Sequence, residues 1–395
     1  MNQSSRRAKE RIFFLDCGRK YYTPEWIKKL MLTVKEEGFN TFYIHFAEDI
    51  GHRLESKQYP FLAGGDSTLC VYGTVNGVPG DDDKYYTQEV MAELVRFAQA
   101  NGLEVVPSFD SPGHMNYAVK KYNAHFGANI SNYFHKNGRV ELVHGSSRTG
   151  EAAQLNYSRG IDLSNAEAVT FAKNLYREYG LFFRSLGCTK FDIGGDELLG
   201  FGETIDESLS KWQNLEHWDA AAKERTQNEK AVAYDLFVMY VNELCDMLRA
   251  MGYETIRMWN DDAYRDFDTD YTGVVKIDPE LVIQYWSKNA NGGKNTVGVY
   301  LEHGHKVLNF ISYYTYYVVG RGPHDDVPPE QVEREWDAYV FDKDIPENNP
   351  TAPHEGVLGG GFCLWSDLPA RETEDEVFAH VLPYIKAIGK KLLGC

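Results

Sequence analysis

The sequence predicts an α/β protein, a (β/α)8 barrel of the TIM type with long strand-to-helix loops. Eight short runs of β-branched and aromatic residues recur along the chain, most of them followed by a segment with helical periodicity. The runs are continuously apolar, as expected for parallel strands buried on both faces. Helix-to-strand connections are short, whereas several strand-to-helix connections are long, as at the working face of such barrels. A doubly wound open sheet is the alternative, but it would not require eight strands.

The predicted strands are spread over the whole chain. They cover residues 11–18, 41–47, 103–110, 190–197, 255–261, 281–286, 306–312 and 360–367. No low-complexity linker separates them. We therefore expect one barrel domain over residues 1–395, with no separate domain before it.

The first predicted helix has both a start and a stop signal. Thr23 can cap it, Pro24 occupies its first position, and Gly38 ends it. Its apolar residues recur at helical spacing, namely Trp26, Ile27, Leu30, Met31 and Val34. Similar segments cover 88–101, 166–179, 228–251, 329–340 and 374–393, whereas the stretch between the fifth and sixth strands shows little helical pattern.

The composition limits the possible partners. The net charge is −17, so a partner that needs a basic surface, such as nucleic acid or an anionic membrane, is not expected. Aromatic residues make up 14% of the chain. An acidic, aromatic-rich chain fits a neutral polar ligand with apolar faces, such as a sugar, although a bulky core explains the composition equally well. The composition does not indicate an oligomeric state.

The cysteines and the N-terminus bear on the compartment. The six cysteines are scattered without the spacing of a zinc site, so we expect buried free thiols. We also expect no metal and no cofactor. Free thiols suit a reducing compartment. The only apolar run near the N-terminus is short and is already predicted to be a strand. We see no secretory leader or membrane span and expect a cytoplasmic protein, although a trimmed leader would leave the same pattern.

Polar and aromatic residues gather at the predicted carboxyl ends of the strands. They are Asp16, Arg19, His45, Glu48, Asp49, Asp110, His114, Asp196, Glu197, Trp259, Asp261, Trp286, Tyr314, Trp365 and Asp367. Because these ends meet at one rim of a barrel, we expect the side chains to share a site. A phosphate site is not expected, since the two acids after Gly194-Gly195 would repel phosphate.

Asp196-Glu197 is the sharpest feature of this rim. Two adjacent charges at the end of an apolar run are costly to bury, although a helix cap followed by a first-turn acid would also explain them. Consecutive strand residues point to opposite sides, so the pair does not suit the acid and nucleophile that flank one bond in most retaining glycosidases. One acid/base and one helper acid, acting with the substrate's own nucleophile, fit better.

Six motifs resemble glycoside hydrolase family 20, the β-N-acetylhexosaminidases. FDIGGDE (191–197) is similar to the family's H-x-G-G-D-E, DCGR (16–19) to its D-x-x-R, and SPGH (111–114) to its P-G-H. The family also has three motifs that each contain a tryptophan, and these are similar to MWND (258–261), YW (285–286) and LWSD (364–367). The motifs occur in the family's order at the predicted strands, and the single-barrel layout is most similar to dispersin-type hexosaminidases and lacto-N-biosidases.

The resemblance implies an exo-acting, retaining β-N-acetylhexosaminidase that acts on an oligosaccharide or glycoconjugate. In this chemistry the 2-acetamido oxygen attacks its own anomeric carbon and forms an oxazolinium ion. The resemblance implies that Glu197 serves as acid and then base, that Asp196 orients the acetamido N–H, and that Tyr314 donates to the acetamido oxygen. Tyr313 could take this role in place of Tyr314. Alternatively, Tyr314 is an ordinary core residue.

The resemblance also implies a set of substrate-binding residues. They are Arg19, His114, Trp259, Asp261, Trp286, Tyr316, Trp365 and Asp367. The tryptophans would enclose the acetamido group, Arg19 would bind ring hydroxyls, and His114 would bond an acid that supports Glu197. Each role has an alternative. The tryptophans could serve only barrel packing, Arg19 could form a salt bridge to Asp16 or Asp367, and His114 could be a buried structural histidine.

Three positions depart from the family pattern. AEDIG (47–51) replaces S-D-D-Q-G, Tyr316 replaces an aspartate two residues after the key tyrosine, and Asp367 replaces the glutamate of W-x-E. The shorter acid leaves more room where a terminal hydroxyl is bound. A lacto-N-biosidase that releases Gal-β1,3-GlcNAc is therefore the first alternative to a β-N-acetylhexosaminidase. A non-catalytic sugar-binding barrel is the second alternative.

Overall fold

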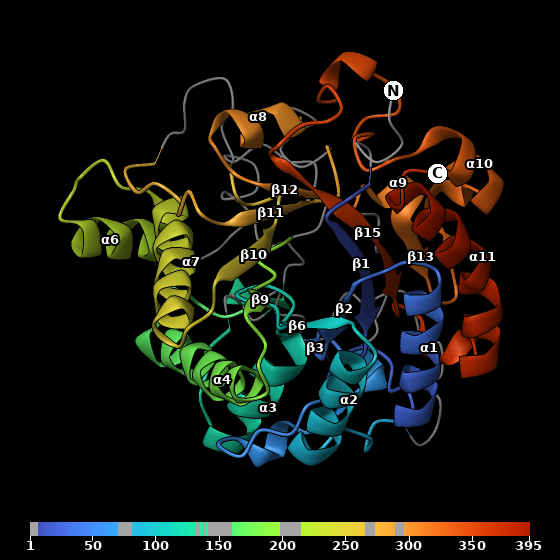
Figure 1. Cartoon of the computed structure of the whole chain (residues 1–395). Helices are drawn as coiled ribbons and strands as arrows, with labels where there is room; N and C mark the ends of the chain where they lie inside the picture. Colours follow the sequence, from blue (N-terminus) through green and yellow to red (C-terminus); the bar gives the residue numbers. More distant parts are fainter. Residues whose placement is uncertain are drawn as a thin grey trace.

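The structure, a computed structural model of the chain, describes residues 7–69, 81–131, 135–136, 139–140, 160–197, 215–264, 273–288 and 296–395. Eight parallel strands form the centre of the molecule (Figure 1). They are β1 (Glu10–Asp16), β2 (Thr41–His45), β6 (Glu104–Ser108), β9 (Lys190–Asp192), β10 (Thr255–Trp259), β11 (Val282–Tyr285), β12 (Val307–Asn309) and β15 (Val357–Trp365). Each strand pairs with the next, and β15 pairs with β1. The predicted barrel is confirmed, and the open sheet is excluded.

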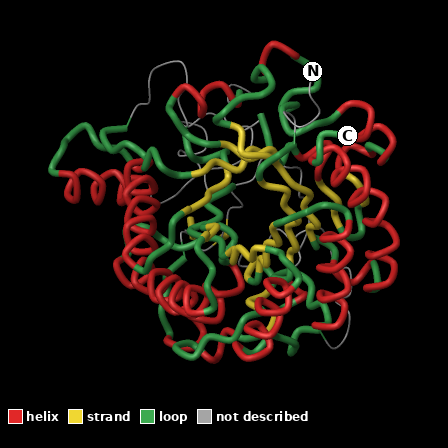
Figure 2. Tube along the Cα trace, in the orientation of Figure 1, coloured by secondary structure: helices red, strands yellow, loops and turns green. Residues whose placement is uncertain are grey.

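Helices surround the strands (Figure 2). The six predicted segments correspond to α1 (Pro24–Glu36), α2 (Gln88–Ala100), α4 (Ala166–Ser185), α7 (Ala233–Ala250), α10 (Pro329–Glu335) and α11 (Glu374–Leu392). Helix α1 follows Thr23, whose side chain accepts from the Trp26 N–H, and it buries the predicted apolar stripe. Helix α10 is shorter than predicted because Trp336 takes an extended conformation and is buried.

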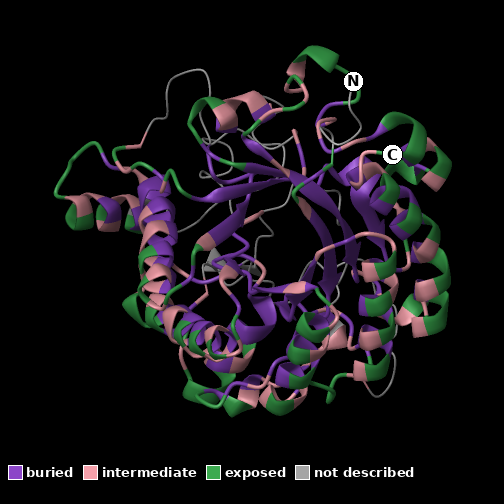
Figure 3. Cartoon of the chain, in the orientation of Figure 1, coloured by how far each residue is buried: buried purple, intermediate pink, exposed green. Residues whose placement is uncertain are grey.

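Within the part of the chain that the structure describes, four further α-helices have no clear periodic signal in the sequence. They are α3 (Asn116–Phe126), α6 (Leu215–Thr226), α8 (Val297–Glu302) and α9 (Ser312–Thr315). As expected, the described residues between β10 and β11 contain no helix. The strands line a buried interior, whereas the outer faces of the helices are exposed (Figure 3).

Two small additions shape the carboxyl rim of the barrel. Strand β13 (Tyr316–Val318) pairs in parallel with the last residues of β15, Tyr316 opposite Cys363, and turns back as β14 (Gly322–Pro323). Strands β3 (Ala47–Glu48), β4 (Gly51–His52) and β5 (Gly64–Gly65) form a separate sheet after β2. They bring Tyr316 and Glu48 to the ends of the barrel strands.

The cysteines agree in part with the sequence analysis. Cys17, Cys188, Cys245 and Cys363 are buried free thiols, as predicted, whereas Cys395 is exposed. Cys70 lies outside the described residues. No helix among the described residues is long and apolar enough to cross a membrane.

A buried ion pair joins the strands near their amino ends. Arg257 of β10 is fully buried, donates to Glu10 Oε2 at 2.6 Å and also bonds the Tyr43 hydroxyl. Lys190 Nζ lies 3.4 Å from Glu10. Glu10 therefore links three strands through charges that the barrel interior shields from water.

We predict that Glu10→Gln lowers the free energy of unfolding by about 3–5 kcal/mol, because it leaves the Arg257 charge buried without its partner. Urea denaturation measures the change. The control is Glu333→Gln, which removes the exposed Lys390 ion pair and should cost less than about 1 kcal/mol. Equal effects in the two variants would contradict the proposed importance of the buried pair.

Candidate active site

The turn after β1 is fixed by a buried carboxylate. Asp16 accepts from the Arg19 backbone N–H at 3.0 Å, from the Arg19 guanidinium at 2.9 Å and from the Ser366 N–H at 3.0 Å. Asp16 is fully buried. The first and last strands thereby fix the backbone at Arg19.

Arg19 is surrounded by acids and one ring. Its guanidinium lies 2.8 Å from Glu48 and 4.0 Å from Asp367, and 5.5 Å from the ring centre of Trp365. The side chain keeps 15% of its surface exposed. Arg19 therefore forms the predicted salt bridges, and the exposed part of its side chain remains accessible to a ligand.

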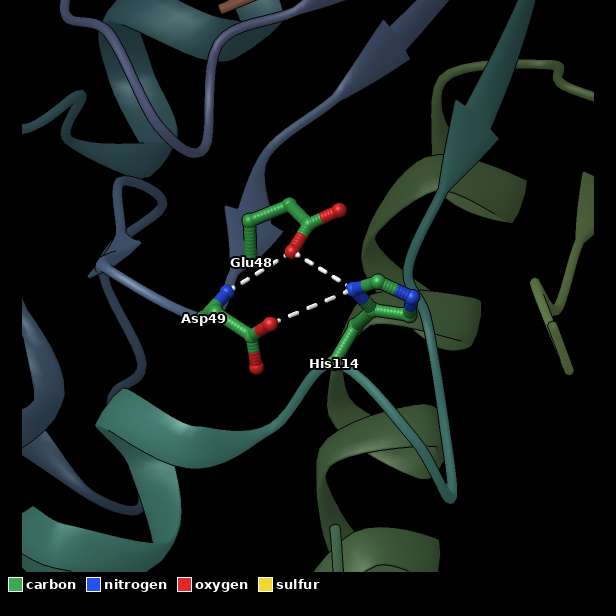
Figure 4. A group of neighbouring side chains, drawn as sticks. All are labelled: Glu48, Asp49 and His114. Carbon is green, nitrogen blue, oxygen red and sulfur yellow. Dashed lines mark hydrogen bonds and ion pairs between the residues drawn. The ribbon is translucent and has the colours of Figure 1, made fainter. Parts of the chain in front are cut away.

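His114 lies between Glu48 and Asp49 on one side, as Figure 4 shows, and the acid pair on the other. Its Nδ1 lies 3.1 Å from Glu48 and 3.4 Å from Asp49, while Nε2 lies 3.6 Å from Asp196 and 3.5 Å from Glu197. Burial would lower the pKa of His114, but the surrounding carboxylates, Glu48 foremost, raise it well above the usual value. We infer that His114 is an imidazolium that faces both acids.

Two groups of side chains at this rim have the composition of metal ligands. The ligand atoms of Glu48, Asp49 and His114 lie within 4.8 Å of one another, as do those of Asp110, His114 and Asp196. His114 makes ion pairs within both groups. The ion pairs explain the clustering without a bound cation.

Asp196 and Glu197 lie in a left-handed turn, because β9 ends at Asp192. Gly194 has φ +68°, and a Cβ there would lie 2.0 Å from Asp110 Oδ1. Asp110 Oδ1 accepts from the Gly195 N–H at 2.8 Å, and Asp261 Oδ2 accepts from the Glu197 N–H at 2.7 Å. Acids after the two neighbouring strands thus hold the turn from both sides.

The prediction that 190–197 is a strand with the two acids on opposite sides is wrong. Strand alternation does not apply to a turn, and both carboxylates reach the same nitrogen of His114. Glu197 is the more open of the two, with 32% of its side chain exposed against 14% for Asp196. The turn therefore presents one open and one enclosed acid side by side.

The enclosed acid lies close to a second carboxyl, that of Asp110. Burial, and then the neighbouring Asp110, raises the pKa of Asp196 well above its usual value, while His114 opposes the shift. Burial raises the pKa of Asp110 as well. Two carboxyls in contact cannot both ionise easily, so we infer that they share one proton.

Asp261 links Glu197 to the aromatic wall. Its Oδ1 accepts from Trp286 Nε1 at 3.1 Å, while its Oδ2 holds the Glu197 N–H. Burial, followed by the neighbouring Asp262, raises the pKa of Asp261 to about 8, although both hydrogen bonds oppose the shift. Asp261 therefore positions the backbone of Glu197 and the ring of Trp286 at the same time.

Aromatic rings form the opposite wall. Trp286 is half-buried and stacks on Tyr316 at 6.3 Å with an angle of 8° between the planes. The edge of Tyr316 meets Trp365 at 5.7 Å, and Trp365 lies 6.0 Å from Trp259. Trp259 is only 1% exposed and packs on Phe14 and Phe310, so it forms the floor of the wall.

Tyr314 lies outside this group. Its hydroxyl donates to Glu335 of α10 at 3.1 Å, and its ring packs against Tyr313. The Tyr313 hydroxyl bonds the backbone at Phe341 and Lys343. Residues 312–315 form helix α9 and not a strand, so their side chains turn by about 100° per residue instead of alternating.

Tyr316 occupies the site instead. It is the first residue of β13, lies between Trp286 and Trp365, and interacts electrostatically with Asp196 and Asp261. Burial is the largest of the effects that raise the pKa of Tyr316 well above its usual value. The phenol therefore keeps its proton and can donate a hydrogen bond, so Tyr316 is a second candidate beside Tyr314 for the tyrosine role.

Asp367 lies beside Arg19, as the motif order suggests. Its second oxygen is 3.6 Å from Arg321, a residue between β13 and β14 that the sequence analysis missed because it belongs to no motif. Burial raises the pKa of Asp367, and Arg19 opposes the shift. Arg19, Asp367 and Arg321 together form a polar end to the site.

We predict that Glu197→Gly raises the free energy of unfolding by about 1 kcal/mol, because a non-glycine residue in the left-handed region is strained. Glu197 has φ +50°. Gln227→Gly is the matched control, since Gln227 has φ +53° at the exposed end of α6, and urea denaturation should show a similar gain. A loss of stability in Glu197→Gly alone would show that its side chain compensates the strain.

Comparison with known proteins agrees with the motif order. Residues 10–391 match the family model "Glycosyl hydrolase family 20, catalytic domain". Beta-hexosaminidase subunit A1 of Dictyostelium discoideum is 25% identical over 90% of this chain and 54% of its own length. Lacto-N-biosidase of Bifidobacterium bifidum is 23% identical over 78% of this chain and 23% of its own length.

The chain thus spans about half or less of these two relatives. Among solved structures, Dispersin B aligns over 97% of this chain and 99% of its own, with a TM-score of 0.66 and 22% identity. This likeness supports the fold. Because the family model covers nearly the whole sequence, the chain belongs to glycosyl hydrolase family 20.

Proposed function

We propose that this chain is an exo-acting, retaining β-N-acetylhexosaminidase that removes N-acetylhexosamine from glycan ends by substrate-assisted catalysis. The observation that carries the proposal is the side-by-side presentation of Asp196 and Glu197 on one imidazole, opposite an aromatic wall. Both acids approach from the same turn. This arrangement suits a substrate that supplies its own nucleophile.

Glu197 and Asp196 differ in solvent exposure, as their different roles in the proposed mechanism require. Glu197 is the more exposed and would protonate the leaving oxygen, then deprotonate water. Asp196 is enclosed beside Asp110, and their interaction raises the pKa of Asp196 and opposes the raised pKa of Asp110. The proposed mechanism therefore requires the shared proton to move to Asp110 when Asp196 accepts the acetamido N–H. Its negative charge would then stabilise the developing oxazolinium ion.

The acetamido group would lie against the aromatic wall. Tyr316 would donate to the acetamido oxygen and orient it toward the anomeric carbon, in a role the family motif assigns to a tyrosine. The ring faces of Trp286 and Trp365 suit the methyl group and the C–H surface of the sugar. An internal nucleophile held in this way can lower the barrier by about 7–11 kcal/mol.

We predict that Glu197→Gln lowers kcat for p-nitrophenyl β-N-acetylglucosaminide at least about a hundredfold, because it removes the general acid. A thiazoline analogue of the intermediate should still bind the variant tightly. Glu335→Gln, which changes the carboxylate bonded to Tyr314, is the control and should leave kcat within about twofold. Near-normal turnover of Glu197→Gln would refute its role, and indifference to thiazoline would refute the acetamido mechanism.

We predict that Tyr316→Phe lowers kcat about 10²-fold or more, as expected for the loss of one donor to the reacting oxygen. Tyr314→Phe should leave kcat within about threefold, because its hydroxyl bonds α10. Steady-state kinetics of the two variants decide which tyrosine acts. The reverse order of effects would restore Tyr314 to the role.

A second candidate is a lacto-N-biosidase, favoured by Asp367, whose side chain is shorter than the glutamate of the family's W-x-E motif. A small hollow, in part open to solvent, lies beside Arg19 and is lined by Arg19, Ile50, Arg53, Ser67, Asp81, Asp82 and Pro369. Product analysis after digestion of lacto-N-tetraose and of chitobiose distinguishes disaccharide from monosaccharide release.

A further inference from the structure

A hydrogen-bonded chain runs through the barrel interior beneath the site. Asp192 ends β9, and its Oδ2 accepts from the Ser108 hydroxyl at 2.7 Å. Its Oδ1 accepts from Gln284 Nε2 at 2.9 Å and from the Gly194 N–H at 3.2 Å. Asp192, Ser108 and Gln284 are fully buried. The mechanism proposed above uses none of these three side chains.

The chain continues to the acids at the rim. Ser108 Oγ lies 2.8 Å from His45 Nδ1, and His45 Nε2 lies 3.5 Å from Glu48 Oε1. Glu48 Oε2 in turn lies 3.1 Å from His114 Nδ1. Asp192 is therefore connected, through two side chains and Glu48, to the imidazole that touches both Asp196 and Glu197.

The hydrogen count of this chain and the charge of Glu48 together favour a doubly protonated His45. Ser108 has one hydroxyl hydrogen, and when Asp192 Oδ2 accepts it, the serine oxygen accepts from Nδ1–H of His45. Nε2 forms no hydrogen bond but lies 3.5 Å from Glu48 Oε1, and the negative charge of this carboxylate favours a proton on Nε2. With both ring nitrogens protonated, His45 is an imidazolium between two acids.

The surrounding charges favour this proton. His45 faces Glu48, Asp16 and Asp110, and burial alone opposes its raised pKa. Asp192 faces His45 and Asp110, with the neutral groups of Tyr43, Tyr176 and Cys363 nearby. Burial raises the pKa of Asp192 to about 6, against its hydrogen bonds from Ser108 and Gly194.

We propose that Asp192, Ser108 and His45 are positioning residues that hold a proton on His45 against Glu48 and thereby keep Glu48 on His114. Loss of this proton at alkaline pH would set an unprotonated nitrogen against the Glu48 carboxylate and loosen the support of His114. Asp192 stands where the family motif has histidine, so the device is a property of this sequence. Its effect on rate rests on the proposed function, whereas the protonation of His45 does not.

The test is Asp192→Asn, which keeps the shape and the Oδ1 acceptor for Gln284 and Gly194 but removes the charge. The new amide would donate to Ser108, so Ser108 would donate to His45 Nδ1 and the imidazole would become neutral. We expect the alkaline limb of kcat/KM to move to lower pH by about one unit, with the acid-side rate within about threefold. Ser108→Ala should shift the limb in the same direction by less, because the Asp192 charge remains.

The ¹⁵N NMR signals of His45, identified by their absence in His45→Gln, measure its protonation without substrate. Both nitrogens should be protonated at pH 7 in the parent protein, and Nδ1 should lose its proton in Asp192→Asn. Glu104→Gln is the control, since it removes an acid from the other end of β6 and should change neither readout.

A His45 with one protonated nitrogen in the parent protein would overturn the proposal. So would an unchanged pH profile in Asp192→Asn, or an equal loss of rate at all pH values together with a lower Tm, which indicates a purely structural role. If the parent protein hydrolyses no hexosaminide, only the proposed function fails, and the NMR measurement still decides the protonation of His45.

Discussion

The whole rim depends on balancing an excess of buried acids. The acids are Asp16, Glu48, Asp49, Asp110, Asp196, Asp261 and Asp367, and all are enclosed by the ends of the barrel strands. Arg19, His114, Arg321 and the proposed imidazolium of His45 supply the opposing charge. Since four cations cannot neutralise seven ionised carboxylates, some acids must keep or share protons. The raised pKa values of Asp110, Asp196 and Asp261 are the result of this constraint.

The same constraint explains why the acid pair lies in a strained turn. A strand through Asp196 and Glu197 would send the two carboxylates to opposite sides, one of them away from any cation. The left-handed turn lets both carboxylates reach His114. Asp110 and Asp261 accept hydrogen bonds from the backbone N–H groups of this turn. The backbone energy stored at Glu197 is thus the cost of bringing two acids to one imidazolium. Such strain is common where side chains are positioned for a function.

Sequence reasoning found the barrel and the residues of its rim because both leave periodic or compositional signals. Continuous apolar runs locate strands, and the residues that follow them meet at one end of any such barrel. Side-chain direction has no comparable signal. It depends on where a strand stops, and β9 stops at Asp192 while Tyr314 falls in a helical turn. Arg321 was missed because a hairpin between strands carries no motif.

The polar end of the site also bears on which sugars could enter. The shorter Asp367 suggests extra room, and Arg321 approaches Asp367 to 3.6 Å. A small hollow lined by Arg53 and Asp81 also adjoins Arg19. Both features therefore lie next to Arg19. Specificity within the proposed function then depends on how Arg19 is held, and thus on Glu48, which binds both Arg19 and His114.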